Sequence, residues 1–185
     1  MIIKSLLGNL SLIYLNTKKN IYQIYQNSSF YNKKISKVFN NNFEYKPSPH
    51  LFSSIVKYQK KKYRIEDFAL ESIWQNNIKI KDYEKLNNFF WFFSLDLKSS
   101  KKTVRSLIVN WIGNNNRYND KSWNFDLTSK RIISWLSNHQ LTYEDSDKEY
   151  RIKFNHCIQK QANHLLSEIR NSNDFENKMS FYNEN

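Results

Sequence analysis

The stretch YEKLNNFFWFFSLDL, residues 83–97, carries the strongest secondary-structure signal in this sequence. Several of its apolar residues recur at spacings of 3, 4, 3 and 4, which places them on one face of a helix. These residues are Tyr83, Leu86, Phe90, Phe93 and Leu97. Phe89, Trp91 and Phe92 fall off that face. The stretch therefore predicts a helix that is apolar almost all round and covered by neighbours on several sides.

Two segments that follow show the same periodicity. Ser99 and Ser100 can cap a helix that ends at Gly113 and a run of Asn residues. Its predicted apolar face holds Val104, Leu107, Ile108 and Trp111. Asp126 is a favourable N-cap for the next helix. The apolar residues of that helix are Ile132, Ile133, Trp135 and Leu136.

The acidic stretch 144–149 suits the start of a fourth, long helix, because carboxylates stabilise the positive end of the helix dipole. Its apolar positions follow at spacings of 4, 4, 4, 3 and 4, and they are Tyr150, Phe154, Ile158, Ala162, Leu165 and Ile169. Short connections imply antiparallel neighbours. With only two Gly and two Pro, the chain also has few helix breakers. The sequence thus predicts an all-α fold of antiparallel helical hairpins.

The N-terminal third is predicted to be irregular after an amphipathic helix at residues 3–13. Residues 17–50 lack a clean period and close on two prolines, and 53–65 indicate a short extended segment. We divide the chain into a basic N-terminal helix with an irregular segment, residues 1–52, and a helical domain, residues 53–185. The opening has no small-x-small cleavage site and is too short to cross a bilayer, so it predicts neither a signal peptide nor a transmembrane helix.

Positive charge is concentrated near the N-terminus. Residues 1–65 hold 12 Lys and Arg against the single acid Glu44, whereas residues 66–185 hold 17 against 16. Such an arm suits a polyanion: nucleic acid, an anionic membrane or an acidic glycan. The competing interpretation is genome bias, because 26 Asn and 23 Lys against six Arg are typical of AT-rich coding. The Lys60–Lys62 run is itself typical of a solvated segment.

Several classes of site are excluded by composition. Cys157 is the one cysteine, so no internal disulfide or cysteine-based zinc site forms. Gly8 and Gly113 are too far apart for a phosphate-binding loop. His156 and His164 lie eight residues apart, about 12 Å along a helix, too far to share a metal. The sequence supports neither a metal nor an organic cofactor.

Three stretches, within about residues 53–180, together resemble one family. The first is Ile73-Trp74 followed by Leu86-x-x-Phe89-Phe90-Trp91. The second is Leu107-Ile-Val-x-Trp111-Ile, then Trp123, then Ser129-x-Arg131-Ile-Ile-x-Trp135-Leu. The third is Tyr150-Arg151 followed by Gln161-Ala162-x-x-Leu165. Their order and spacing resemble the helical domain of bacterial heparinase II/III-like polysaccharide lyases.

That resemblance implies an incomplete (α/α) toroid, a bacterial periplasmic or cytoplasmic setting, and an acidic polysaccharide as substrate. Lyases of this family break uronate-containing glycans by β-elimination, with His and Tyr moving the protons. The family's Asn-His-Leu motif is expected near residues 172–182, where this chain has no His. We therefore expect a non-catalytic N-terminal part of such a lyase, whose missing C-terminal portion is a candidate partner. Asn163-His164-Leu165 resembles the motif but is expected to lie in the preceding helix, which makes His164 an outside candidate for catalysis.

Four residues are candidate substrate contacts under the resemblance: Trp91, Trp123, Arg131 and Trp135. Trp faces suit pyranose rings, and Arg can grip both oxygens of a carboxylate. Arg131 and Trp135 are also spaced to stack on one another as a cation–π pair. The alternative interpretation is that all four pack in the helical core.

A second hypothesis comes from another class of protein: a non-catalytic helical module that binds a polyanion through its basic N-terminal third. Nucleic acid is the obvious candidate, because Tyr and Phe are available to stack bases, but the near neutrality of the helical part argues against it. Affinity that falls steeply with salt and disappears on deletion of residues 1–65 would distinguish it.

Overall fold

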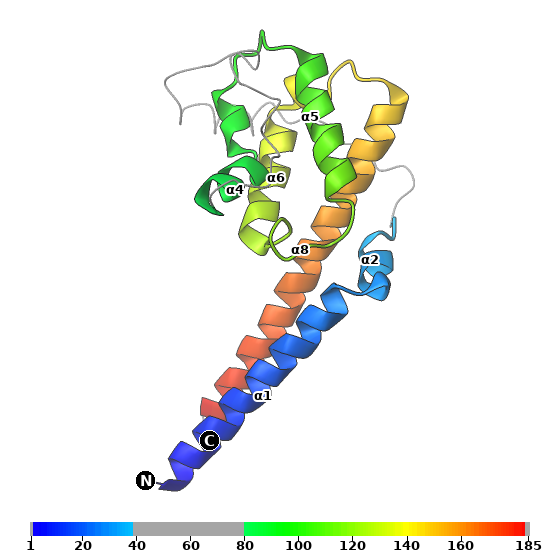
Figure 1. Ribbon diagram of the computed structural model, residues 1–185. Helices are drawn as coiled ribbons and strands as arrows, with labels where there is room; N and C mark the ends of the chain where they lie inside the picture. Colours follow the sequence, from blue (N-terminus) through cyan, green and yellow to red (C-terminus); the bar gives the residue numbers. More distant parts are fainter. Residues whose placement is uncertain (1, 39–79, 184–185) are drawn as a thin grey trace.

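The computed structural model describes residues 2–38 and 80–183, and this part of the chain is all-α (Figure 1). Its helices are α1 (Ile2–Gln26), α2 (Ser29–Ile35), α4 (Ile80–Asn87), the 3-10 helix η3 (Phe90–Ser94), α5 (Lys101–Asn114), α6 (Phe125–Ser137), α7 (His139–Thr142) and α8 (Lys148–Asn183). The predicted extended segment at 53–65, its lysine run and the domain boundary at residue 52 lie outside the described residues.

The long helix α8 organises the molecule. Figure 1 shows α4, α5 and α6 packed around its N-terminal half and α1 lying beside its C-terminal half, so that a helical head continues into a two-helix stalk. The chain direction alternates from α5 to α6 to α8, and α1 runs antiparallel to α8. This arrangement confirms the prediction of antiparallel helical neighbours.

The prediction of one continuous helix over residues 83–97 is wrong. Helix α4 ends at Asn87, and Phe89 has a φ of 57°, in the left-handed region. The Asn88 side chain accepts a hydrogen bond from the backbone N–H of Phe90 at 2.8 Å, and the Asn87 Oδ1 accepts one from Trp111 Nε1 at 2.8 Å. These contacts stabilise the break, which turns Phe89 into the core with no exposed surface.

Helix α1 is longer than expected, so the prediction of an irregular segment from residue 17 is wrong for the part that is described. The helix continues to Gln26, and α2 follows almost at once. Contacts with α8 explain this extension: the Tyr22 hydroxyl donates to the Glu168 carboxylate at 3.1 Å, and the Gln26 amide donates to the same oxygen. The Asn163 amide then fixes the end of α2 by donating to the Ile35 carbonyl at 2.8 Å.

The predicted caps were confirmed in one helix and wrong in the next. Ser100 caps α5 and accepts from the Thr103 N–H at 3.2 Å, as expected. Helix α6 is capped instead by Asn124, which accepts from the Leu127 N–H at 2.9 Å, and Asp126 lies in its first turn. Asn and Asp are almost equally good caps, so their order in the sequence does not decide between them.

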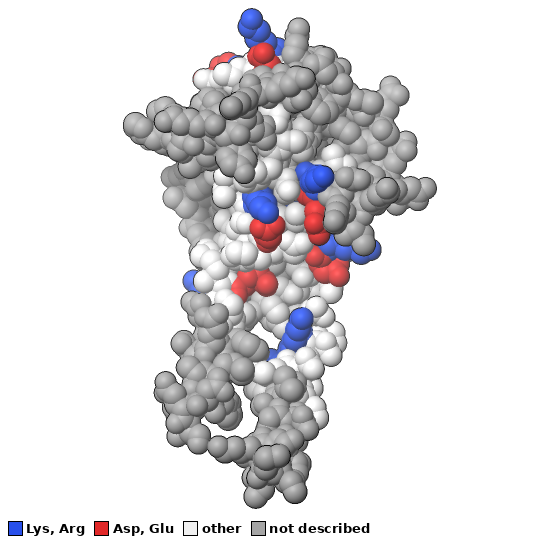
Figure 2. Space-filling model, turned by 90° about the vertical axis from the view of Figure 1, so that its left-hand side faces the viewer, with Lys and Arg blue, Asp and Glu red and all other residues white. Residues whose placement is uncertain are grey.

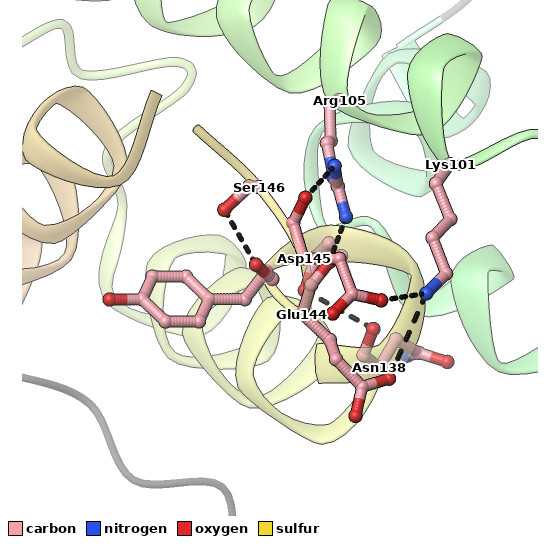
Figure 3. Close-up of polar contacts among 8 residues, drawn as sticks. Lys101, Arg105, Asn138, Glu144, Asp145 and Ser146 are labelled. Atoms are coloured by element: carbon pink, nitrogen blue, oxygen red, sulfur yellow. Dashed lines mark hydrogen bonds and ion pairs between the residues drawn. The ribbon is translucent and has the colours of Figure 1, made fainter. Parts of the chain in front are cut away.

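The acidic stretch 144–149 begins α8 as predicted only in its second half, where Glu149 lies in the first turn; Glu144 and Asp145 form a loop that is fixed to α5. Figure 3 shows Lys101 and Arg105 pointing toward this loop. Lys101 Nζ lies 3.0 Å from the Asp145 carboxylate, and Arg105 donates to the Glu144 carbonyl. Asp145 has a φ of 57°, which is incompatible with a helix. Helix α8 begins only after Asp147, whose Oδ1 accepts from a first-turn N–H at 2.8 Å.

The described charges are mixed in sign on the face seen in Figure 2, where Lys and Arg side chains lie among Asp and Glu side chains. This agrees with the near balance of 17 basic and 16 acidic residues after residue 65. Within residues 2–38 and 80–183, no helix has both the length and the apolar character needed to cross a membrane.

Candidate functional site

The four predicted substrate contacts lie mainly inside the head. Trp123, Arg131 and Trp135 have no exposed surface, and Trp91 is half-buried. In this conformation Arg131 and Trp135 have the contacts of packing residues, whereas Trp123, although buried, is among the residues that line the cleft described below. Whether any of them touches a substrate stays a prediction.

Arg131, which lies on α6, contacts three other helices at the centre of the head: α4, α5 and α8. Its Nε donates to the Gln161 amide oxygen of α8 at 2.7 Å, and its Nη1 donates to the carbonyls of Asn87 and Ser122 at 2.8 and 3.0 Å. Its guanidinium carbon lies 3.9 Å from the centre of the Trp111 ring. Burial lowers the pKa of this guanidinium to about 9, which leaves it charged at neutral pH. The side chain is thus a buried cation held by neutral oxygens and an aromatic face.

Trp135 packs in an aromatic cluster instead of stacking on Arg131, the pairing that its spacing suggested. Its ring centre lies 5.2 Å from that of Phe89, 5.5 Å from that of Trp111 and 5.7 Å from that of Phe154. Trp111 therefore takes the cation–π position over Arg131, because it comes from the facing helix α5.

His164, the outside candidate for catalysis, is buried with both ring nitrogens occupied. Nε2 lies 2.6 Å from the Trp123 carbonyl, which can only accept, so this nitrogen carries the hydrogen. Nδ1 then accepts from the Tyr31 hydroxyl at 2.7 Å. Burial is the main cause that lowers the pKa of His164 to about 4. The imidazole is therefore neutral at pH 7 and has no free nitrogen for proton transfer in this conformation.

Stability is expected to fall as the pH drops from about 6.5 toward 4, because the unfolded chain takes up a proton that folded His164 rejects. The contribution lost is up to about 3 kcal/mol in the free energy of unfolding. Urea denaturation at several pH values measures it. His164→Gln should flatten the curve in this window, and an unchanged pH dependence in that variant would contradict the assignment.

A cleft between α5 and α8 is one of the hollows that the described residues form; another lies beside the C-terminal end of α1. We call the first the α5–α8 cleft; its volume is about 390 Å³. Its lining residues are Val109, Ile112, Gly113, Asn115, Asn116, Trp123, Lys153, His156, Cys157 and Lys160. Three basic side chains of α8 thus face an aliphatic wall from α5, and no carboxylate is among the lining residues.

The basic residues of this cleft differ in their surroundings. Lys160 is buried and donates to the Asn116 carbonyl, and burial lowers its pKa. Partial burial lowers the pKa of His156, and the Lys160 charge lowers it further. Lys153 is more exposed and pairs with Glu149 at 2.6 Å. An anion in the cleft would be stabilised by these cations and would oppose the effect of Lys160 on His156.

Cys157 closes the floor of the cleft. The thiol is 6% exposed, and its sulfur accepts a hydrogen bond from the Gln161 amide at 3.1 Å. Burial raises its pKa to about 11, which keeps it protonated and weakly nucleophilic at neutral pH. The cleft is therefore suited to binding an anion and lacks an activated thiol.

Sequence reasoning missed this cleft because its two walls are about 40 residues apart in the chain. One signal was present: Lys153, His156 and Lys160 are spaced by three and four residues, which puts three basic groups on one face of α8. The sequence prediction considered His156 only as a candidate metal ligand together with His164, and it left out Lys153 and Lys160 on either side of His156.

Neither a family model, nor a curated protein, nor a solved structure matches this chain. The resemblance to heparinase II/III-like lyases therefore stays a prediction from the residues quoted for it.

Proposed function

We propose that this chain supplies a helical part of a heparinase II/III-type polysaccharide lyase, within an incomplete (α/α) toroid, and that it binds an acidic glycan without cleaving it. The observation that supports this proposal is the meeting of the resembling stretches at one place. Arg131 of the second stretch donates to Gln161 of the third, and Trp135 of the second packs on Phe89 of the first. Residues that hold helices together in this way are those that a shared framework requires.

Binding without catalysis follows from the state of the candidate groups. A lyase base must reach the proton next to the uronate carboxylate, and His164 is neutral but buried and fully hydrogen-bonded. The α5–α8 cleft, in contrast, has cations that suit a uronate carboxylate and an aliphatic wall that suits the apolar face of a sugar ring. We assign glycan binding to this cleft.

A uronate oligosaccharide is expected to bind the purified chain, to raise the pKa of His156, and to yield no unsaturated uronate. Titration followed by NMR of the His156 ring measures the first two effects, and ultraviolet absorbance of the product measures the third. Lys153→Gln should weaken binding by a few-fold, because it removes an exposed cation from the lining. Lys130→Gln, on α6 and outside the cleft lining, is the matched control.

Two outcomes would contradict parts of this proposal. Product formation that His164→Ala abolishes would make the chain catalytic by itself. A His156 pKa unmoved by any acidic oligosaccharide would remove glycan binding from the cleft, while leaving the helical framework to be tested separately.

The second candidate function, binding of a polyanion through the basic N-terminal third, is favoured by the charge of α1 and α2. Residues 1–38 hold six Lys and no acid. The affinity of these lysines for a sugar or nucleic-acid polyanion should fall as the salt concentration rises.

A further inference from the structure

Helix α1 has two faces with different partners. On the inner face, Tyr22 and Gln26 hydrogen-bond to Glu168 of α8. The opposite side, which we call the outer face, consists of large apolar residues: Ile13 is 62% exposed, Tyr14 58%, Ile21 62% and Ile24 72%. Figure 1 shows α8 on one side of α1 along the stalk and no other described helix opposite it.

The outer face is continuous along the helix. Ile13 and Ile24 are 11 residues apart and Tyr14 and Ile21 are seven apart, close to three and two helical turns. The positions between them on this face, Thr17 and Asn20, are polar but uncharged. Apolar side chains that line up in this way and remain exposed indicate an interaction surface, unlike apolar residues scattered singly.

The charge of the surrounding helices indicates what covers this face. Residues 1–38, which include α1 and α2, have six Lys and no acid, so this N-terminal part of the chain is basic. A second copy docked α1 against α1 would set its Lys4, Lys18 and Lys19 beside the same three lysines of the first copy, with no acid on either α1, and the like charges would repel. A nucleic acid would accept the Lys but would leave the isoleucines unburied. A bilayer surface with anionic lipid satisfies both, because its acyl chains take up apolar side chains and its headgroups attract Lys.

We propose that the outer face of α1 docks on a bilayer surface that contains anionic lipid. The helix lies in the plane of the interface, with Ile13, Ile21 and Ile24 below the headgroups. Tyr14 places its ring at the same level and its hydroxyl toward water, as tyrosines do at membrane interfaces. Lys18 lies at the edge of the apolar face, one turn after Tyr14, where its long side chain reaches the headgroups. The inner face stays on α8, so docking requires no unfolding of the stalk.

Co-sedimentation with vesicles tests the proposal on the full chain. Vesicles of phosphatidylcholine mixed with phosphatidylglycerol are expected to bind the protein, and pure phosphatidylcholine vesicles to bind it on the order of tenfold more weakly. Ile21→Gln combined with Ile24→Gln should lower the partition coefficient by about 100-fold, roughly tenfold for each isoleucine. Both residues are exposed, so the fold should be retained, and circular dichroism checks this.

A matched control exists on α8. Ile152 is 61% exposed, almost the same as Ile21 at 62%, but lies on the head near the start of that helix. Ile152→Gln should leave vesicle binding unchanged. The proposal would be overturned if both substitutions weakened binding equally, if mixed vesicles bound no better than neutral ones, or if the lipid-free protein were a dimer that the double variant dissociates. None of these results would bear on glycan binding in the α5–α8 cleft, which has its own readout.

Discussion

Replacing Arg131 by methionine is expected to lower the free energy of unfolding by about 3–5 kcal/mol. The substitution leaves three buried carbonyl-type oxygens without their donor, those of Asn87, Ser122 and the Gln161 amide, and it also breaks the longer bond to the Thr128 hydroxyl at 3.3 Å. Each stranded acceptor costs about 1–3 kcal/mol. The Arg131→Met substitution also removes the cation from the face of the Trp111 ring. Urea denaturation followed by tryptophan fluorescence measures the difference.

An opposing effect makes this experiment informative. Methionine also removes the cost of burying a charge, which reaches several kcal/mol for one ion. We expect the three stranded oxygens to outweigh that relief, because methionine has no donor to offer them. Arg131→Lys should be destabilising as well, since lysine keeps the charge but not the planar fork. An Arg131→Met variant as stable as the parent would show that desolvation dominates at this site.

The neighbouring residue provides the control. Lys130 pairs with Asp126 at 2.6 Å on the exposed side of the same helix. Lys130→Met should change the free energy of unfolding by no more than about 0.5 kcal/mol, as is usual for an exposed pair four residues apart.

Replacing Trp135 by alanine is expected to cost about 3–5 kcal/mol in the free energy of unfolding. The ring has no exposed surface and contacts Phe89, Trp111 and Phe154, which come from separate parts of the head. Its removal leaves a cavity that these rings cannot fill without leaving their own contacts. The indole N–H has no hydrogen-bond partner in this conformation, so the loss is one of packing.

Trp91→Ala is the comparison for this variant. Trp91 is half-buried and touches Phe89 and Phe92 at the edge of the same cluster. Its removal should cost clearly less, because the site can collapse or fill with water. Thermal or urea unfolding of both variants gives the ranking. If Trp91→Ala were the more destabilising, the centre of the core would lie nearer to η3 than the structure places it.

The parts of the fold that follow from local rules could be predicted from the sequence. The apolar spacing of α5 and its Ser100 cap are local, and both were confirmed. The break after Asn87 was missed because a run of aromatic residues fits a helical period equally well. What decides it is the hydrogen bond from Trp111, 24 residues away, to the Asn87 side chain. The short helix α7 was missed for a related reason: the Thr142 hydroxyl that helps to hold it donates to the Trp135 carbonyl in the preceding helix.

The candidate site was harder to predict than the helices. The sequence pointed to Arg131 as a substrate contact, which stays a prediction; the ring on the face of its guanidinium is that of Trp111, not that of Trp135 four positions further on. Spacing along one helix reports only which side chains share a face, whereas the packing of facing helices selects the contact. The basic face of α8, formed by Lys153, His156 and Lys160, can be predicted from the sequence. The wall from α5 that turns this face into a cleft cannot be predicted from it.

The buried thiol at the floor of the cleft can report how often the head opens locally. Cys157 is the only cysteine, 6% exposed and kept protonated by its surroundings. A thiol reagent therefore reacts at a rate set by how often α5 and α8 separate, and the modified fraction at successive times records the frequency of that separation. A ligand that holds the two helices together slows this reaction. Modification of this single residue therefore reports both the separation of α5 from α8 and the binding of a ligand in the cleft.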